Sequence, residues 1–139
     1  MGGTVNAKVK MVEDMRLIGY ADSGHAIVVD ASGEKKASSP MELVLIALAS
    51  CSSMDVIAIL KKKRQDLRDL EVTVSGQRAE TDPKVYTHLN IHYKVTGRDL
   101  SSEAVRKTIE LSQDKYCSVL AMVAKTATVE YDSEIINVD

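Results

Sequence analysis

The feature that most constrains the fold of this chain is a helix, predicted from Pro40 to about Arg64, that is apolar on almost every side. Its start is well marked, because Ser39 and Glu42 form a Ser-x-x-Glu capping box with proline at the first helical position. Positions 43–59 then present apolar side chains in nearly every direction. A single domain of 139 residues can rarely enclose such a helix. We therefore expect two copies to pack through it as a homodimer.

Short strands are expected before this helix. Residues 4–12 alternate apolar and polar side chains, which is typical of a half-buried strand. Residues 15–20 and 25–30 predict two more strands, and the Ala-Asp-Ser-Gly segment 21–24 favours a turn between them. The N-terminal third is thus predicted to be a small antiparallel meander.

The chain after the helix predicts a hairpin, a pair of helices and a last strand. Residues 70–80 and 85–95 alternate like strands with one wet face, and Pro83 lies in the turn between them. A helix follows, then a helical segment from Cys117, and residues 127–137 close the chain as a strand. The candidate caps of the first of these helices are Asp99, Ser101 and Ser102, and its expected inward side chains include Val105, Ile109, Ser112 and Tyr116. Runs of strands and helices predict one α+β domain, residues 1–139, with helices packed on antiparallel sheet.

Charge and motifs argue against several function classes. The net charge of −2 is unlike that of a nucleic-acid binder, and the basic run 61–64 suits the last turn of the long helix. The longest apolar run, 43–49, is far below the roughly 18 residues of a membrane span. The N-terminus lacks a secretory signal pattern, so a cytoplasmic protein is expected. No glycine-rich phosphate loop occurs, so no nucleotide cofactor is expected.

The histidines do not indicate a metal site. His88 and His92 fall on the polar face of the predicted hairpin, and His25 follows a turn glycine. Close Cys and His pairs with metal-ligand spacing do not occur. We expect no bound metal.

Two cysteines remain as candidates for chemistry. Cys51 lies in mid-helix among alanines and serines, where an inert buried thiol and a reactive one are equally compatible with the pattern. Cys117 lies where one helix ends and another begins, and we expect the N–H groups there to favour its thiolate. If the two meet, one could attack a peroxide and the other could resolve the sulfenic acid as a disulfide. The separation of the two cysteines in sequence does not show that they meet.

Three segments resemble a known family. The helix segment 39–60, SPMELVLIALASCSSMDVIAIL, resembles the central helix of the OsmC/Ohr family, in which a peroxidatic cysteine follows the proline by eleven positions, the separation of Pro40 and Cys51. ELSQDKYCSVLAMVAKTATV, at 110–129, resembles the family's second-cysteine segment, and THLNIHYKVTG, at 87–97, resembles the strand before its second helix. Most of residues 25–139 take part in the likeness, which is greatest to the YhfA-like branch.

The resemblance implies an OsmC-like fold in which antiparallel sheets pack around long central helices of an intertwined homodimer, with active sites at the subunit interface. It implies reduction of organic hydroperoxides without a cofactor. Cys51 would be the peroxidatic and Cys117 the resolving cysteine, and a dithiol, such as a lipoyl group, would be the reductant.

The resemblance also implies a glutamate and an arginine at the active site, and here the chain departs from the family pattern. Family peroxidases carry the glutamate directly after the helix-starting proline, where this chain has Met41. Glu42 lies one position later, about 100° around the helix, and also has its role in the capping box. The family's arginine lies in an N-terminal segment, and Arg16 is the nearest candidate for it by position. The alternative interpretation is that Arg16 is a surface arginine on a strand. Ser118 follows the second cysteine where family peroxidases often have proline.

Two other functions are compatible with the same sequence. The dimer could bind a small apolar ligand, with both cysteines as packing residues. It could also be a thiol-based redox sensor whose disulfide changes a partner-binding surface.

Overall fold

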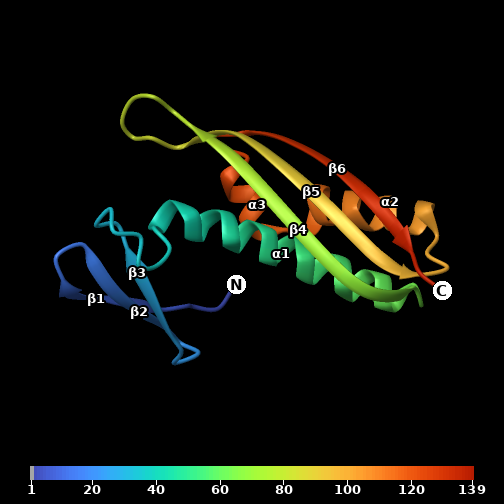
Figure 1. The fold of residues 1–139 in the computed structure, drawn as a ribbon, viewed down its shortest axis with the longest axis horizontal. Coiled ribbons are helices and arrows are strands. Elements are labelled where there is room, and N and C mark those ends of the chain that lie inside the picture. Colours follow the sequence, from blue (N-terminus) through green and yellow to red (C-terminus); the bar gives the residue numbers. More distant parts are fainter. Residues whose placement is uncertain (1) are drawn as a thin grey trace. The chain divides into compact units, whose positions relative to one another are not determined.

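The computed structural model describes residues 2–139, and the chain divides into two compact units with a boundary between Val44 and Leu45. Each unit contains one three-stranded sheet of the described residues, and a long helix begins at the end of the first unit. Figure 1 shows the elements of both units in sequence colours. The α+β class predicted from the sequence is confirmed.

The N-terminal unit is an antiparallel meander of β1 (Ala7–Glu13), β2 (Arg16–Ala21) and β3 (Ala26–Asp30). This arrangement confirms the predicted topology. The expected half-burial of the first strand is wrong, however, since every residue of β1 is exposed. Val9 and Met11 are 59% and 68% exposed, because β1 is the edge strand of a small sheet.

The long helix α1 spans Pro40–Lys62, close to the predicted limits. Its capping box is present as predicted: the Glu42 carboxylate accepts from the Ser39 N–H at 2.9 Å, and Ser39 Oγ accepts from the Glu42 N–H at 3.3 Å. One stripe of the helix is buried, with residues four positions apart: Leu48, Ser52, Val56 and Leu60. Apolar side chains also lie on its exposed side, namely Ile46, Met54 and Ile57.

Among residues 2–139, α1 is the one helix with an 18-residue window apolar enough for a membrane span, at a mean hydropathy of 2.3. The core helix of a water-soluble protein passes the same test. The length and hydropathy of α1 are therefore not by themselves evidence of a membrane location.

The C-terminal sheet consists of β4 (Asp66–Arg78), β5 (Tyr86–Arg98) and β6 (Thr128–Asn137). The β4–β5 hairpin is antiparallel, as predicted. β6 pairs with β5 in parallel, so the prediction of a purely antiparallel sheet is wrong. The reason is the crossover: the helices after β5 return the chain to the start of that strand, and β6 then runs beside it in the same direction.

The crossover is made by α2 (Ser102–Leu111), a π-helical turn η1 (Ser112–Tyr116) and α3 (Ser118–Val123). In Figure 1 these helices and the C-terminal part of α1 lie along one face of the β4–β5–β6 sheet. The inner face of β5 is buried at every second position, at Leu89, Ile91, Tyr93 and Val95. Together with apolar side chains of the helices, these residues form the core of the unit.

The predicted inward face of the second helix is confirmed at Val105, Ile109 and Ser112, all of which are buried. It is wrong at Tyr116, which is 49% exposed. The π turn adds a residue per turn, so a side chain that would face inward on a continuous α-helix is rotated outward here. Of the candidate caps, Ser101 is the N-cap, with its Oγ accepting from the Ala104 N–H at 3.2 Å.

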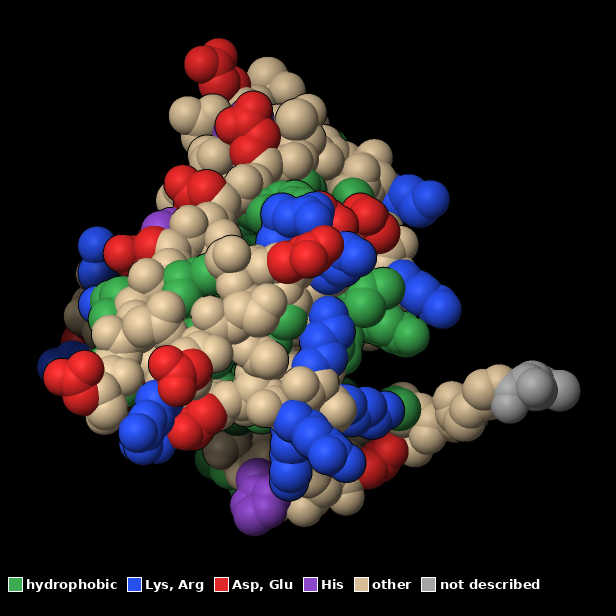
Figure 2. All heavy atoms as spheres, turned by 90° about the vertical axis from the view of Figure 1, so that its right-hand side faces the viewer, with side chains coloured by type: hydrophobic (Ala, Val, Ile, Leu, Met, Phe, Trp, Pro, Cys, Tyr) green, Lys and Arg blue, Asp and Glu red, His purple; other side chains and the backbone are tan. Residues whose placement is uncertain are grey.

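Charged side chains of both signs are mixed on the surface. Figure 2 shows Lys and Arg side chains interspersed with Asp and Glu on the face that it draws. Lys61 and Lys62 lie in the last turn of α1, as predicted for the basic run.

Candidate active site

The fold brings the two cysteines together. Cys51 lies in α1, and Cys117 lies at the junction of η1 and α3, where its backbone caps α3. Cys117 neighbours Cys51 and lowers its pKa, and Ser118 Oγ lies 3.8 Å from the Cys51 sulfur. Both cysteines are free thiols, with Cys51 half-buried and Cys117 3% exposed. A pair separated by most of the C-terminal unit in sequence is thus adjacent in space.

The surroundings of Cys51 favour its thiolate. Burial by itself raises the pKa of Cys51, but hydrogen bonds outweigh that effect, so the pKa lies below the ordinary value of a cysteine. The donors are the backbone N–H of Val119, the Cys117 thiol, and the hydroxyl and N–H groups of Ser118. Ser118 and Val119 are residues of the candidate site that the sequence did not indicate as donors to Cys51. Ser118 was noted only as a departure from the family pattern.

The surroundings of Cys117 favour its neutral thiol. Burial is the main cause that raises the pKa of Cys117 to about 11, and the neighbouring Cys51 and Asp55 raise it further. The Leu120 N–H donates to the Cys117 sulfur at 3.4 Å, which does not compensate. The expectation that the helix start favours the Cys117 thiolate is therefore wrong: the N–H groups of Ser118 and Val119 act on the more exposed Cys51, and burial outweighs the Leu120 N–H at Cys117.

A buried network of polar side chains lies behind the two cysteines. Ser52 Oγ is 2.6 Å from the Tyr93 hydroxyl and 2.7 Å from Ser112 Oγ. Ser112 Oγ donates to Asp55 at 2.9 Å, and the Gln113 side-chain amide donates to the Tyr93 hydroxyl at 2.7 Å. Ser52, Tyr93 and Ser112 are almost completely buried. The sequence signal for this network was weak, since it consisted of polar residues at predicted inward positions.

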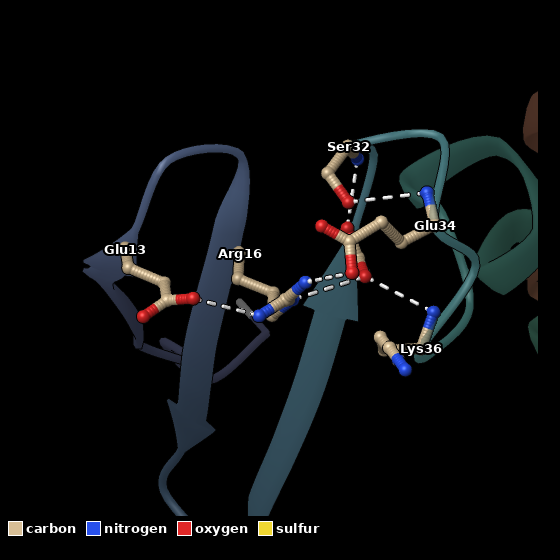
Figure 3. A network of polar contacts seen from close by, with 6 residues as sticks. Glu13, Arg16, Ser32, Glu34 and Lys36 are labelled. Carbon is tan, nitrogen blue, oxygen red and sulfur yellow. Dashed lines mark hydrogen bonds and ion pairs between the residues drawn. The ribbon is translucent and has the colours of Figure 1, made fainter.

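Arg16, the candidate catalytic arginine, lies in the N-terminal unit within a cluster of carboxylates (Figure 3). Its guanidinium pairs with three of them, at 2.9 Å to Glu13, 3.2 Å to Asp30 and 2.9 Å to Glu34. Asp30 is buried and also accepts from the N–H groups of Ser32 and Lys36. The hydrogen bonds from Ser32, then those from Lys36 and Arg16, hold the pKa of Asp30 far below its usual range. The ion pairs with Glu13, Asp30 and Glu34 give Arg16 a structural role in this unit.

Glu42, the other candidate, is engaged in the capping box. Hydrogen bonds from the backbone and side chain of Ser39 lower the pKa of Glu42. Arg16 and Glu42 are thus bound to different partners within the N-terminal unit.

The two histidines of β5 pair with acidic side chains of β6. The His92 ring nitrogens lie 2.6 Å from Asp132 and 3.0 Å from Glu134, and His88 lies 3.6 Å from Glu130. Glu134, and then Asp132, raise the pKa of His92. Both histidines were predicted on a polar face, but these partners were not, because the parallel pairing of β6 with β5 was not foreseen. Residues 2–139 contain no group of three or more His, Cys, Asp or Glu side chains arranged to hold a metal ion.

The model of the OsmC family, described as OsmC-like protein, matches residues 33–132. Protein YhfA of Escherichia coli (strain K12) is 44% identical over 132 residues, which cover 95% of this chain and 98% of YhfA.

Solved structures show the same fold. The crystal structure of a hypothetical protein from Aquifex aeolicus VF5 matches with a TM-score of 0.90 and 30% identity, over 99% of this chain and 100% of that one. An organic hydroperoxide resistance protein OsmC from Legionella pneumophila matches with a TM-score of 0.70 and 17% identity, over 98% of each chain. At that identity, the second likeness concerns the fold alone.

Proposed function

The chain belongs to the OsmC-like family, and from this premise we propose that it is a thiol-dependent redox protein that reduces organic hydroperoxides through Cys51 and Cys117. One observation carries the proposal: the two cysteines are neighbours in the fold, and their surroundings lower the pKa of Cys51 and raise that of Cys117. Such a pair holds a nucleophilic thiolate beside a thiol that keeps its proton.

In the first step, the Cys51 thiolate attacks the terminal oxygen of the hydroperoxide ROOH, and the O–O bond breaks. Sulfur is oxidised to the sulfenic acid Cys51–SOH, and the alkoxide leaves as the alcohol ROH after taking up one proton. Ser118 and Val119 donate hydrogen bonds to the thiolate before the attack.

In the second step, the Cys117 sulfur attacks the sulfur of Cys51–SOH. The Cys51–Cys117 disulfide forms, and the hydroxyl group leaves as water with the proton of the Cys117 thiol. A dithiol reductant, for which we propose a lipoyl-type group, then restores both thiols and becomes a cyclic disulfide. The sum is ROOH plus dithiol giving ROH, water and the oxidised dithiol.

The relatives support the reaction class to different degrees. The name of the 44% identical Escherichia coli protein states no activity. The Legionella pneumophila protein of the same fold is named an organic hydroperoxide resistance protein. The assignment of a peroxidase to this chain therefore depends on its own thiol pair.

We also propose that the protein works in the cytoplasm as a homodimer with active sites at the subunit interface. Apolar side chains remain exposed on one side of α1, at Ile46, Met54 and Ile57. An exposed apolar helix face of this kind is typical of a contact between subunits. The exposed apolar residues of β1 support the same proposal.

The test is a peroxidase assay with a small organic hydroperoxide and a dithiol. Wild-type protein should consume the peroxide and form a Cys51–Cys117 disulfide, which mass spectrometry detects. Cys51→Ser should abolish consumption, and Cys117→Ser should stop at a sulfenic acid that a dimedone probe traps. Ser53→Ala is the matched control, because the Ser53 hydroxyl donates to the Ala49 carbonyl of its own helix at 2.7 Å.

Three results would contradict the proposal. A wild-type protein that keeps two free thiols after peroxide treatment would exclude the mechanism. Rapid stoichiometric oxidation without turnover by any dithiol would favour the redox sensor instead, and unchanged function in Cys51→Ala would favour the ligand-binding protein.

A further inference from the structure

The buried network behind the cysteines has a fixed direction. The Asp55 carboxylate can only accept, so the single hydroxyl proton of Ser112 points to it. Ser112 Oγ must then accept from Ser52, and Ser52 Oγ in turn must accept from Tyr93. The Tyr93 hydroxyl accepts from the Gln113 amide. We call the side chains of Tyr93, Ser52 and Ser112 the hydroxyl chain: every member donates toward Asp55, and each has one arrangement of its proton.

The hydroxyl chain connects three elements at the position of the cysteines. Ser52 and Asp55 belong to α1, with Ser52 directly after Cys51. Tyr93 belongs to β5, and Ser112 is the first residue of η1. Because these groups are buried, breaking any of these hydrogen bonds would leave an unpaired polar group in the core. Such a group lowers the stability of the fold, so the network holds its members in place.

Cys117 is tied to the hydroxyl chain through the backbone. Its N–H donates to the Ser112 carbonyl at 2.9 Å, which closes the π turn. Single π turns are frequently found at functional sites, where the extra residue redirects the chain. Here the turn begins at the residue bound to α1 and ends at the cysteine that contacts Cys51. Ser118 and Val119, which donate to Cys51, follow directly.

We propose that the hydroxyl chain and Asp55 are positioning residues, which fix η1 so that Cys117 and its following N–H groups meet Cys51. This inference rests on the proposed function for its biological role, but the geometry of the thiol pair can be tested without any peroxide. The variant that tests it is Ser112→Ala, which removes the hydrogen bonds of η1 to α1 at one atom. The matched control is Ser53→Ala, the same change two positions after Cys51, outside the hydroxyl chain.

The first measurement is the equilibrium between the protein dithiol and reduced and oxidised dithiothreitol. Oxidised dithiothreitol takes two electrons and two protons from the protein, which forms the Cys51–Cys117 disulfide. We expect Ser112→Ala to favour the disulfide about tenfold less than wild type, since a displaced thiol has a lower effective concentration. This corresponds to a reduction potential about 30 mV higher. Ser53→Ala should match wild type.

The second measurement is the pH profile of Cys51 alkylation by iodoacetamide, followed by peptide mass spectrometry. In Ser112→Ala the midpoint for Cys51 should move to higher pH, because Ser118 and Val119 no longer meet the sulfur. A network that only stabilises the fold would lower the thermal midpoint in circular dichroism and leave the alkylation profile and the equilibrium of the folded protein unchanged. That result would overturn the inference.

Two further results remain decisive. If Ser112→Ala does not fold, Tyr93→Phe replaces it, with Tyr131→Phe as the control. Tyr131 packs edge-on against Tyr93, with ring centroids 6.3 Å apart, but is not a member of the hydroxyl chain. Tyr93→Phe should show the same two shifts at smaller size, and a wild-type result would overturn the inference.

If wild type does not reduce hydroperoxide but Ser112→Ala shows both shifts, the proposed function fails and the positioning role stands.

Discussion

At the scale of single residues, burial and hydrogen bonding decide the pKa values of the two thiols differently. Burial prevails at Cys117, whereas the hydrogen bonds together outweigh burial at Cys51. Cys117 is almost fully enclosed, so the cost of desolvating a charge dominates and its thiol stays neutral. Cys51 is only half-buried and faces several donors, so its charged form is favoured. The difference supports Cys51 as the nucleophile of the proposed reaction, and Arg16, the candidate arginine of the sequence analysis, pairs with Glu13, Asp30 and Glu34.

This difference predicts the order of alkylation. At neutral pH, iodoacetamide should modify Cys51 and leave Cys117 largely unmodified, because only the thiolate reacts. Ser118→Ala should move the Cys51 midpoint to higher pH, though not to the value of a free cysteine, because the Val119 N–H remains. Peptide mass spectrometry over a pH series measures both effects. Equal labelling of the two cysteines in native protein would contradict the assignment.

The sequence sufficed to predict the candidate thiols but not their environments. Cys51 and Cys117 stood out by residue type and by the family motifs around them. The donors to Cys51 belong to Ser118 and Val119, whose position depends on the π turn η1. No pattern of residues in the sequence predicted that turn. Buried polar residues such as Ser52 and Ser112 look like ordinary helix residues until their partners across the core are known.

At the scale of elements, close packing at the end of β5 limits what Gly97 can be replaced by. A Cβ atom at Gly97 would overlap the Asp66 carbonyl oxygen on β4 and lie 2.8 Å from the Leu100 side chain. The backbone atom cannot yield as a flexible side chain can, so the β4–β5 pairing would have to shift.

We therefore predict that Gly97→Ala lowers the free energy of unfolding by about 1–3 kcal/mol. Urea denaturation followed by circular dichroism measures the change. Gly19→Ala is the control, since a Cβ atom there would meet Val9 at an ordinary 3.7 Å. Equal stability of Gly97→Ala and wild type would show that the strand ends can separate without cost.

Local patterns predicted most elements, because hydrophobic periodicity and caps are read from neighbouring residues. The capping box at Ser39 and the alternation in β5 are examples that the structure confirms. The direction of β6 relative to β5 was not predictable in this way. It depends on where the crossover returns the chain, so the pairing of His92 with Asp132 and Glu134 was also missed.

At the scale of the whole molecule, the exposed apolar side of α1 is the feature that a single chain leaves unexplained. Met54 is 70% exposed in the middle of this side. In a symmetric dimer the same residue occurs on both subunits, so one substitution alters the interface twice. A charge at this position would have to be desolvated on association, whereas in the monomer it would stay in water.

Met54→Glu should therefore convert the proposed dimer into a monomer that remains folded. Sedimentation velocity at micromolar concentration measures the assembly, and circular dichroism measures the fold. Gln77→Glu, a charge at an exposed position on β4, is the control and should leave the dimer intact. Peroxide reduction by Met54→Glu should fall with the dimer if the active site is completed by the second subunit. A wild-type protein that sediments as a monomer would contradict the dimer directly, and would leave the thiol pair as a site within one chain.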